Sequence, residues 1–173
     1  MQTPIMQRLK SIADPAISYA LYLLLKPIHQ RFRSAALSTA GLVITGTSGK
    51  KLPKIGAAVF HYVADGTSGQ IAAGVDMPAL SGTVTADYWN VFVFTVDKAG
   101  TTYSHTGTQA TTEAAVKWPT IPNNRAIIGF LKINPTGTGD FVGNTDALDD
   151  VTIVPNAQYV SPTGAIYPGA RVD

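Results

Sequence analysis

Residues that could carry catalysis are few and widely separated in this sequence. His29, His61 and His105 are isolated from one another, and Glu113 is the single glutamate of the chain. A glycosidase-type pair of carboxylates would have to combine aspartates from separate loops, and no spacing indicates such a pair. Cysteine is absent, which excludes disulfides, thiolate metal ligands and a cysteine nucleophile. The sequence therefore predicts a protein that is not an enzyme.

Two glycine-containing segments match nucleotide-binding loops only in part. Residues 46–51 end in Gly-Lys-Lys, but the earlier glycine of a phosphate loop is missing and Lys51 stands where Ser or Thr is required. After Gly137 and Gly139, the next glycine is Gly143, one residue too late for the dinucleotide fingerprint. We expect turns at both segments and no cofactor.

One acidic cluster offers oxygen ligands to a cation. It consists of Asp140, Asp146, Asp149 and Asp150, with Asn144 between them. Calcium prefers several oxygen ligands in a flexible loop. The spacing does not match the calcium-loop motif, and the same residues suit turns closed by Asx hydrogen bonds. No metal site is predicted, with a bound cation as the alternative.

Four aromatic residues near the middle of the chain could form a sugar-binding platform: Tyr88, Trp89, Tyr103 and Trp118. They lie beside the most apolar segments, where packing in a core or an interface is their ordinary role. Carbohydrate binding is therefore an alternative to packing.

The elements that must position these residues are organised around two strands, predicted at residues 90–96 and 126–133. Both runs are β-branched and aromatic, and are bounded by Gly, Pro, Asn or Asp. A turn at residues 97–100 should return the first strand through residues 101–104. In the second strand, plain alternation places Ile127 with Leu131 and Ile133, opposite Ile128 and Phe130.

Both strands are apolar on both faces, so each face must be covered. One cover is expected to be a second sheet of the same domain, and the other a helix or another copy of the chain. Another copy in that position predicts a homo-oligomer. The residues assigned to its interface are Val91, Phe92, Val93, Phe94, Ile127, Ile128 and Phe130.

The first 40 residues follow a helical period instead. Asp14-Pro15 is a good helix start, and Pro27 should kink the helix before a second short piece at residues 28–39. The apolar core at residues 16–25 is far shorter than the roughly 20 residues that cross a bilayer. We therefore expect a packing helix and no membrane association. Its apolar stripe consists of Ile17, Leu21, Leu24, Leu25 and Ile28.

Charge is distributed unevenly along the chain. Residues 1–54 carry eight basic residues against Asp14 alone, a net charge of +7, while the remainder carries five basic and ten acidic residues, or −5. A basic arm suggests a negatively charged partner: an acidic protein surface, nucleic acid or a membrane surface. We expect Arg31 and Arg33 to meet acidic groups of a protein partner, and no nucleic acid.

From residue 41 onward the pattern is all-β. About eight short strands at hairpin spacing, with 16 glycines and 11 prolines, are typical of a jelly roll or another antiparallel β-sandwich. The hairpins include residues 57–64 with 70–75, and short strands are expected at residues 151–154 and 158–160. The predicted organisation is a helical basic arm at 1–40, a β-sandwich domain at 41–160 and an extended strap at 161–173.

Over residues 90–160 the sequence resembles structural proteins of tailed-phage virions. The resemblance is carried by residues 92–97 (FVFTVD), 127–143 (IIGFLKINPTGTGDFVG) and 154–160 (VPNAQYV). Such proteins decorate or cement the phage head or form its fibres, commonly as trimers of β-rich domains. The resemblance implies a location in the virion, with the major capsid protein or another virion protein as partner. The arm lies outside the matched segment.

Three functions follow as hypotheses. The first is a non-enzymatic virion subunit, a capsid decoration protein or head fibre, attached through its arm. The alternative is a tail-fibre or receptor-binding module that recognises a surface glycan, which exposed aromatic residues would favour. A wall or polysaccharide hydrolase is the third, and it would need converging carboxylates or a histidine site.

Overall fold

The computed structural model describes residues 17, 19–21, 23–25, 33–46, 48–136, 138–163, 167–169 and 171–172. In these residues the chain is mainly β with antiparallel sheets, which confirms the predicted fold class at that level. The elements in chain order are β1 (Ala35–Ala36), β2 (Val43–Ile44), η1 (Ser48–Lys50), β3 (Pro53–Lys54), β4 (Phe60–Ala64), β5 (Thr67–Ile71), β6 (Thr83–Val84), β7 (Asn90–Val96), β8 (Thr102–Thr106), η2 (Glu113–Ala115), β9 (Ile121–Pro122), β10 (Ala126–Ile133), β11 (Phe141–Val142), β12 (Gln158–Val160) and β13 (Arg171–Val172).

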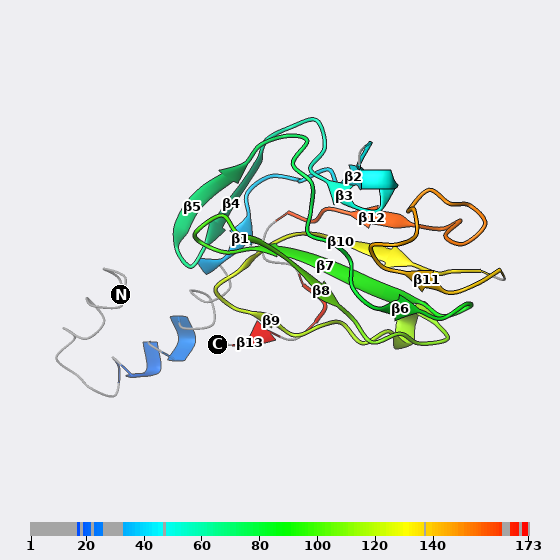
Figure 1. Cartoon of the computed structure of the whole chain (residues 1–173). Helices are drawn as coiled ribbons and strands as arrows, with labels where there is room; N and C mark the ends of the chain where they lie inside the picture. The colour runs from blue at the N-terminus through cyan, green and yellow to red at the C-terminus, as the bar shows by residue number, and fades with distance from the viewer. Residues whose placement is uncertain are drawn as a thin grey trace.

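Two sheets make up most of the body. The larger has the strand order β12-β10-β7-β8, and the smaller has the order β1-β4-β5, all antiparallel. Figure 1 shows β7 and β10 running through the body, with the β4–β5 hairpin at one end. The two predicted central strands are thus confirmed, and so are the hairpins β4–β5 and β7–β8. The central strands also pair with each other. In the second hairpin, Asp97 closes the turn by accepting bonds from the N–H groups of Ala99 (2.9 Å) and Thr101 (3.0 Å).

A single apolar core joins the two sheets. Phe60 and Tyr62 of β4 belong to the same buried cluster as Phe92 and Phe94 of β7 and Ile128 of β10. Every residue of β7 is buried. Burying apolar surface at about 25 cal/mol per Å² is the main stabilising term in such a body. The sheets β1-β4-β5 and β12-β10-β7-β8 therefore share one buried cluster.

A register irregularity between Ile127 and Gly129 changes which residues of β10 share a face. Ile128 joins Leu131 in the main core, while Ile127 packs on the opposite face with Phe130. Plain alternation predicted the reverse pairing and was wrong, because a bulge adds one residue to the strand and inverts its period. A Cβ on Gly129 would lie 2.6 Å from Leu42 Cδ1, so the bulge occurs where the backbone approaches a core side chain.

The second face of the central strands is covered by the chain itself. Val91 and Val93 of β7 and Ile127 of β10 form a smaller buried cluster with Ile121 of β9 and Phe130. The partly buried residues that pack on this cluster are Val116, Trp118, Val160 and Tyr167. The cover expected from a helix or from another copy is thus supplied by residues 116–121 and by the C-terminal segment.

The C-terminal segment finds its neighbour within the chain. β13 pairs in parallel with β9, and the side chain of Arg171 donates a hydrogen bond to the carbonyl oxygen of Arg125 (2.6 Å). The Tyr167 hydroxyl donates to the carbonyl oxygen of Pro119. The segment predicted as a strap thus has partners at both ends: Ser161 bonds to Thr39 and Leu42, and β13 pairs with β9.

Two local predictions differ from the structure. Residues 151–154 form turns and no strand, because Asp150 Oδ1 accepts bonds from the N–H (2.9 Å) and the hydroxyl (2.6 Å) of Thr152 and so closes the backbone locally. Residues 35–36 form strand β1 and no helix, because pairing with β4 outweighs the helix propensity of alanine. The strand at 158–160 is confirmed as β12. The β body thus begins before residue 41.

Candidate functional site

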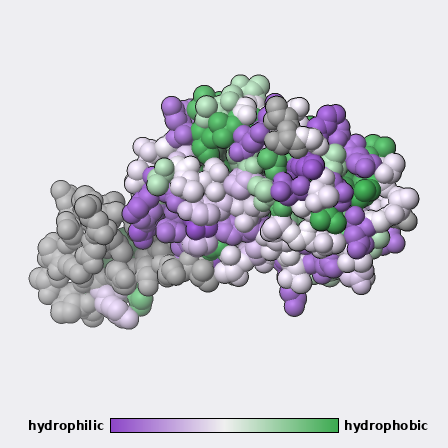
Figure 2. Space-filling view, in the orientation of Figure 1, coloured by the Kyte–Doolittle hydropathy of each residue, from purple (hydrophilic) through white to green (hydrophobic). Residues whose placement is uncertain are grey.

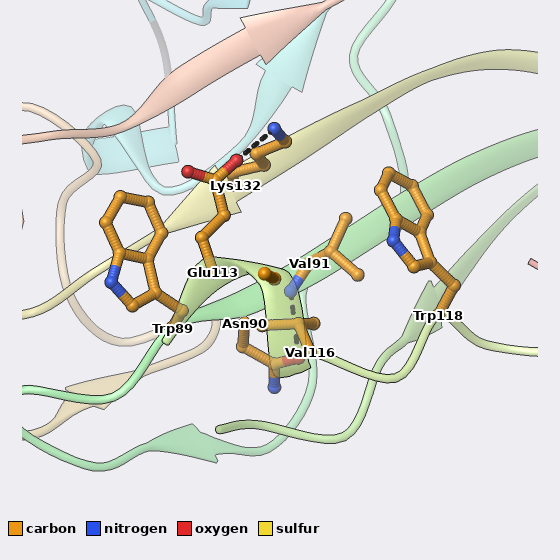
Figure 3. Close-up of a pocket in the computed structure, with 8 residues that line it drawn as sticks. Trp89, Asn90, Val91, Glu113, Val116, Trp118 and Lys132 are labelled. Carbon is orange, nitrogen blue, oxygen red and sulfur yellow. Dashed lines mark hydrogen bonds and ion pairs between the residues drawn. The ribbon is translucent and has the colours of Figure 1, made fainter. Parts of the chain in front are cut away.

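A cavity of about 350 Å³ opens at the end of the larger sheet where β7 begins and β10 ends. We call it the indole pocket, because two tryptophans line it, and Figure 3 shows its side chains. They come from the start of β7, the end of β10, η2 and the segment after η2. The lining residues are Trp89, Asn90, Val91, Glu113, Ala114, Val116, Trp118 and Lys132.

Backbone bonds hold the pocket walls in place. Trp89 and Ala110 exchange two N–H to carbonyl bonds of 2.7 and 3.0 Å, and Thr108 and Lys117 exchange two of 2.9 and 3.1 Å. These bridges fold residues 108–117 back beside β7, so that η2 lies at the mouth of the pocket. Gly107 allows the approach, because a Cβ there would lie 2.8 Å from the carbonyl oxygen of Lys117.

The two indoles differ in how firmly they are held. Trp118 meets the ring of Phe130 edge-on with centroids 4.8 Å apart, and that of Tyr167 with centroids 5.7 Å apart. Such contacts fix an aromatic ring in one orientation. Trp89 stands at the opposite end of the pocket, on the bridge to Ala110 (Figure 3). The pocket thus has one aromatic wall packed against two other rings and one at the backbone bridge just before β7.

An ion pair supplies the polar groups between the two walls. The Lys132 ammonium of β10 contacts Glu113 Oε1 of η2, as Figure 3 shows. Their side chains remain 24% and 45% exposed, so both keep surface for a ligand. Glu113 is the one carboxylate among the described lining residues, and Lys132 the one ammonium group. The pocket therefore offers a ligand one charged acceptor and one charged donor.

Of the four aromatic residues that the sequence analysis groups, the structure brings only Trp89 and Trp118 to one pocket. Tyr88 packs against the main core instead. The ring of Tyr103 is covered by the Arg125 guanidinium, whose central carbon lies 3.5 Å from the ring centroid. Sequence analysis missed Lys132 and gave Glu113 no role, because their pairing depends on strand register and carries no local motif.

A second cluster of polar side chains surrounds His105 on β8. Its Nε2 lies 2.9 Å from the Thr95 hydroxyl and 3.4 Å from Arg125 Nη1. Burial, together with the Arg125 charge, lowers the pKa of His105. Burial opposes ionisation of nearby Asp97, but hydrogen bonds from Tyr103 (2.8 Å) and two backbone N–H groups, with Arg125, outweigh it and lower the pKa of Asp97. The group is held together by its own contacts, and His105 is neutral at pH 7.

The acidic cluster is divided among separate contacts. Asp140 accepts a bond from the Ala86 N–H (2.9 Å), and Asp146 accepts one from the Val142 N–H (2.6 Å). Asp149 pairs with Lys50, and Asp150 accepts a hydrogen bond from the Thr152 hydroxyl.

His61 is exposed on β4, whereas His29 lies outside the described residues. Within the described ranges, no three His, Cys, Asp or Glu side chains gather to hold a metal ion.

The residues predicted to form a subunit interface lie inside the protomer. All seven have exposed fractions of 9% or less. Phe92, Phe94 and Ile128 fill the main core, and the remaining four fill the smaller cluster. Their side chains are covered by other residues of the same chain. Figure 2 shows apolar groups on one face of the body as separate patches between polar ones.

The predicted attachment residues lie in a helical segment wherever they are described. Ile17 and Leu24 are 53% and 65% exposed, while Leu21 and Leu25 are half-buried. Two residues outside the predicted stripe, Tyr19 and Leu23, are exposed as well. Ile28 and Arg31 lie outside the described residues.

Arg33 has an acidic partner within the chain. Its guanidinium contacts Asp65 Oδ1, and Lys98 lies 3.4 Å from the other oxygen of the same carboxylate. Across the described part of the chain, no helix is long and apolar enough to cross a membrane.

No protein-family model, curated protein or solved structure matches this chain. Two surfaces of the described residues are suited to binding: the exposed apolar helical residues before the β body, and the indole pocket on the body itself.

Proposed function

We propose that this chain is a non-enzymatic structural subunit of a tailed-phage virion, a capsid decoration or head-fibre protein that attaches through its N-terminal arm. The observation that carries the proposal is the exposure of large apolar side chains in the helical residues before the body: Ile17, Tyr19, Leu23 and Leu24. The resemblance of residues 92–97, 127–143 and 154–160 to virion proteins supports the setting.

Apolar surface of this kind favours a protein partner. Fully burying a Leu or Ile side chain stabilises a complex by about 1.5–3 kcal/mol relative to leaving it in water. Positive charge accompanies the apolar residues, since the first 54 residues carry +7. Apolar burial then supplies most of the affinity, and the charges aid encounter and register with an acidic surface. An acidic face of the major capsid protein, or of another virion protein, has the required character.

We propose a fold and an assembly for the β body as well. The core shared by the three-stranded and four-stranded sheets supports an antiparallel β-sandwich, for which a jelly roll is the form expected from the sequence. The copies assemble as a homotrimer through surfaces other than the buried central strands. The short edge strands of the two sheets present unpaired backbone groups suited to such contacts.

The experiment measures incorporation into particles. Full-length chain carrying Leu21→Asp with Leu24→Asp is compared with wild type by quantifying the protein in purified virions. We expect the substituted chain to fold and to be lost from particles, because two charges cannot be buried without partners. Val43→Asp with Val151→Asp is the matched control, since both valines are exposed on the body.

Arg31→Ala with Arg33→Ala should weaken incorporation less, and mainly at low salt. Normal occupancy of the leucine variant would refute attachment through the arm. In that case the β body itself carries the docking surface.

A further inference from the structure

We propose that the indole pocket binds a neutral sugar ring, stacked on Trp89 and hydrogen-bonded by the Glu113–Lys132 pair, with Trp118 as the opposite wall. This inference goes beyond the proposed structural role and does not depend on it. A volume of about 350 Å³ lies at the lower end of the roughly 300–1,000 Å³ of ligand pockets, which suits a ligand of one sugar ring.

The tryptophans give the pocket its apolar surface. The chain has only two, 29 positions apart in the sequence, and both line this one cavity. An indole offers a broad apolar face and an N–H donor, and a ring with one apolar face and a polar rim complements both. The C–H face of a pyranose is such a surface. Phe130 and Tyr167 already fix the orientation of Trp118, so little entropy is lost there on binding.

The ion pair gives the pocket its polar specificity. An ammonium group only donates hydrogen bonds and an ionised carboxylate only accepts them, whereas a hydroxyl does both. Two neighbouring hydroxyls can therefore bond to Lys132 and Glu113 together, one accepting from nitrogen and the other donating to oxygen. Both side chains are partly exposed and lie between the two indoles (Figure 3).

Charge at the pocket disfavours other ligands. A quaternary ammonium ion would suit two tryptophans, but the Lys132 ammonium neutralises Glu113 and repels a second cation. A phosphate needs a free cation, and Lys132, the one cation among the described lining residues, is already paired. A nucleoside could stack between the indoles, and the experiment has to separate it from a sugar.

The full-length protein provides its own probe, because both tryptophans report on the pocket. Methyl α-glucopyranoside, methyl α-mannopyranoside, methyl β-galactopyranoside and N-acetylglucosamine are titrated to high millimolar concentration while tryptophan emission is recorded. Saturation-transfer NMR on the same samples confirms contact. Adenosine and tetramethylammonium chloride are run beside them. We expect at least one sugar to bind with millimolar affinity and to change the emission, with neither comparison compound binding.

Substitutions then test the assigned roles. Trp89→Ala should weaken sugar binding by about tenfold or more, equivalent to ~1.4 kcal/mol, and Trp89→Phe should weaken it less. Lys132→Met should also weaken binding, whereas Lys98→Met should leave it unchanged. Lys98 is a matched control, because it too is paired with a carboxylate but does not line the pocket. Circular dichroism checks that each variant is folded.

Each outcome decides the proposal. Sugar binding that Trp89→Ala or Lys132→Met weakens and Lys98→Met leaves intact supports it. Binding of adenosine or tetramethylammonium in place of every sugar overturns the ligand class. Absence of sugar binding by both methods, or binding that the folded pocket variants leave unchanged, overturns the site. None of these results alters the expected incorporation into virions, so the two proposals can fail separately.

Discussion

Substituting Phe94 tests whether its side chain is buried within one protomer or at an interface between subunits. Its side chain is 0% exposed, and it lies in the core that joins the two sheets. Removing such a ring costs about 3–5 kcal/mol, against about 5–15 kcal/mol of stability for a whole domain. We therefore expect Phe94→Ala to lower the free energy of unfolding by that amount, without changing the sedimentation coefficient of the molecules that remain folded.

The assay is urea denaturation followed by circular dichroism, with sedimentation velocity on the same samples. Ile128→Val, in the same buried cluster on β10, should cost a smaller amount, about 0.5–1.5 kcal/mol. Val151→Ala is the control: this side chain is 75% exposed, and its removal should change stability by less than about 0.5 kcal/mol. A Phe94→Ala protein that is as stable as wild type but sediments as a smaller, folded species would refute burial within the protomer.

Two further predictions concern charge and backbone packing. Because burial depresses the pKa of folded His105 below its unfolded value of about 6.5, the stability it contributes is present above that pH and is lost as pH falls below it. His105→Gln should therefore reduce the loss of stability between pH 7 and about 5, measured as the urea midpoint at each pH; an unchanged loss would contradict the argument. Gly129→Ala should cost about 1–3 kcal/mol, because its Cβ would lie 2.6 Å from Leu42 Cδ1. Gly139→Ala, with nothing within 4 Å of the new Cβ, should be close to neutral, and equal melting temperatures for the two variants would contradict the packing.

The strands were predictable where a local pattern decides them. Residues 90–96 and 126–133 are mostly apolar, and the turn at Asp97 has its own side-chain hydrogen bonds, so both strands and the β7–β8 hairpin follow from sequence. The inverted period of β10 does not follow, because the bulge at Gly129 depends on how closely Leu42 and β12 approach it. Strand β1 was missed for a similar reason, since two alanines pair with β4 only in the folded chain.

The indole pocket was predictable only in part. Tryptophans beside a strong strand pointed to an aromatic cluster, but nothing local distinguishes Trp89 and Trp118 from Tyr88 or Tyr103. Their separation arises because residues 108–117 fold back over the sheet through two backbone bridges. Val116, Trp118 and Ile121, together with Tyr167, supply the cover over Val91 and Val93 that was expected from a helix or from a second copy of the chain.

An electron cryomicroscopy map of the intact particle tests the proposed function most directly. The account predicts density for the β body at regular positions on the head, joined to the shell by the helical residues around Leu24. A map in which the body docks without those residues, or purified particles that lack this chain, would contradict attachment through the arm and the structural role built on it.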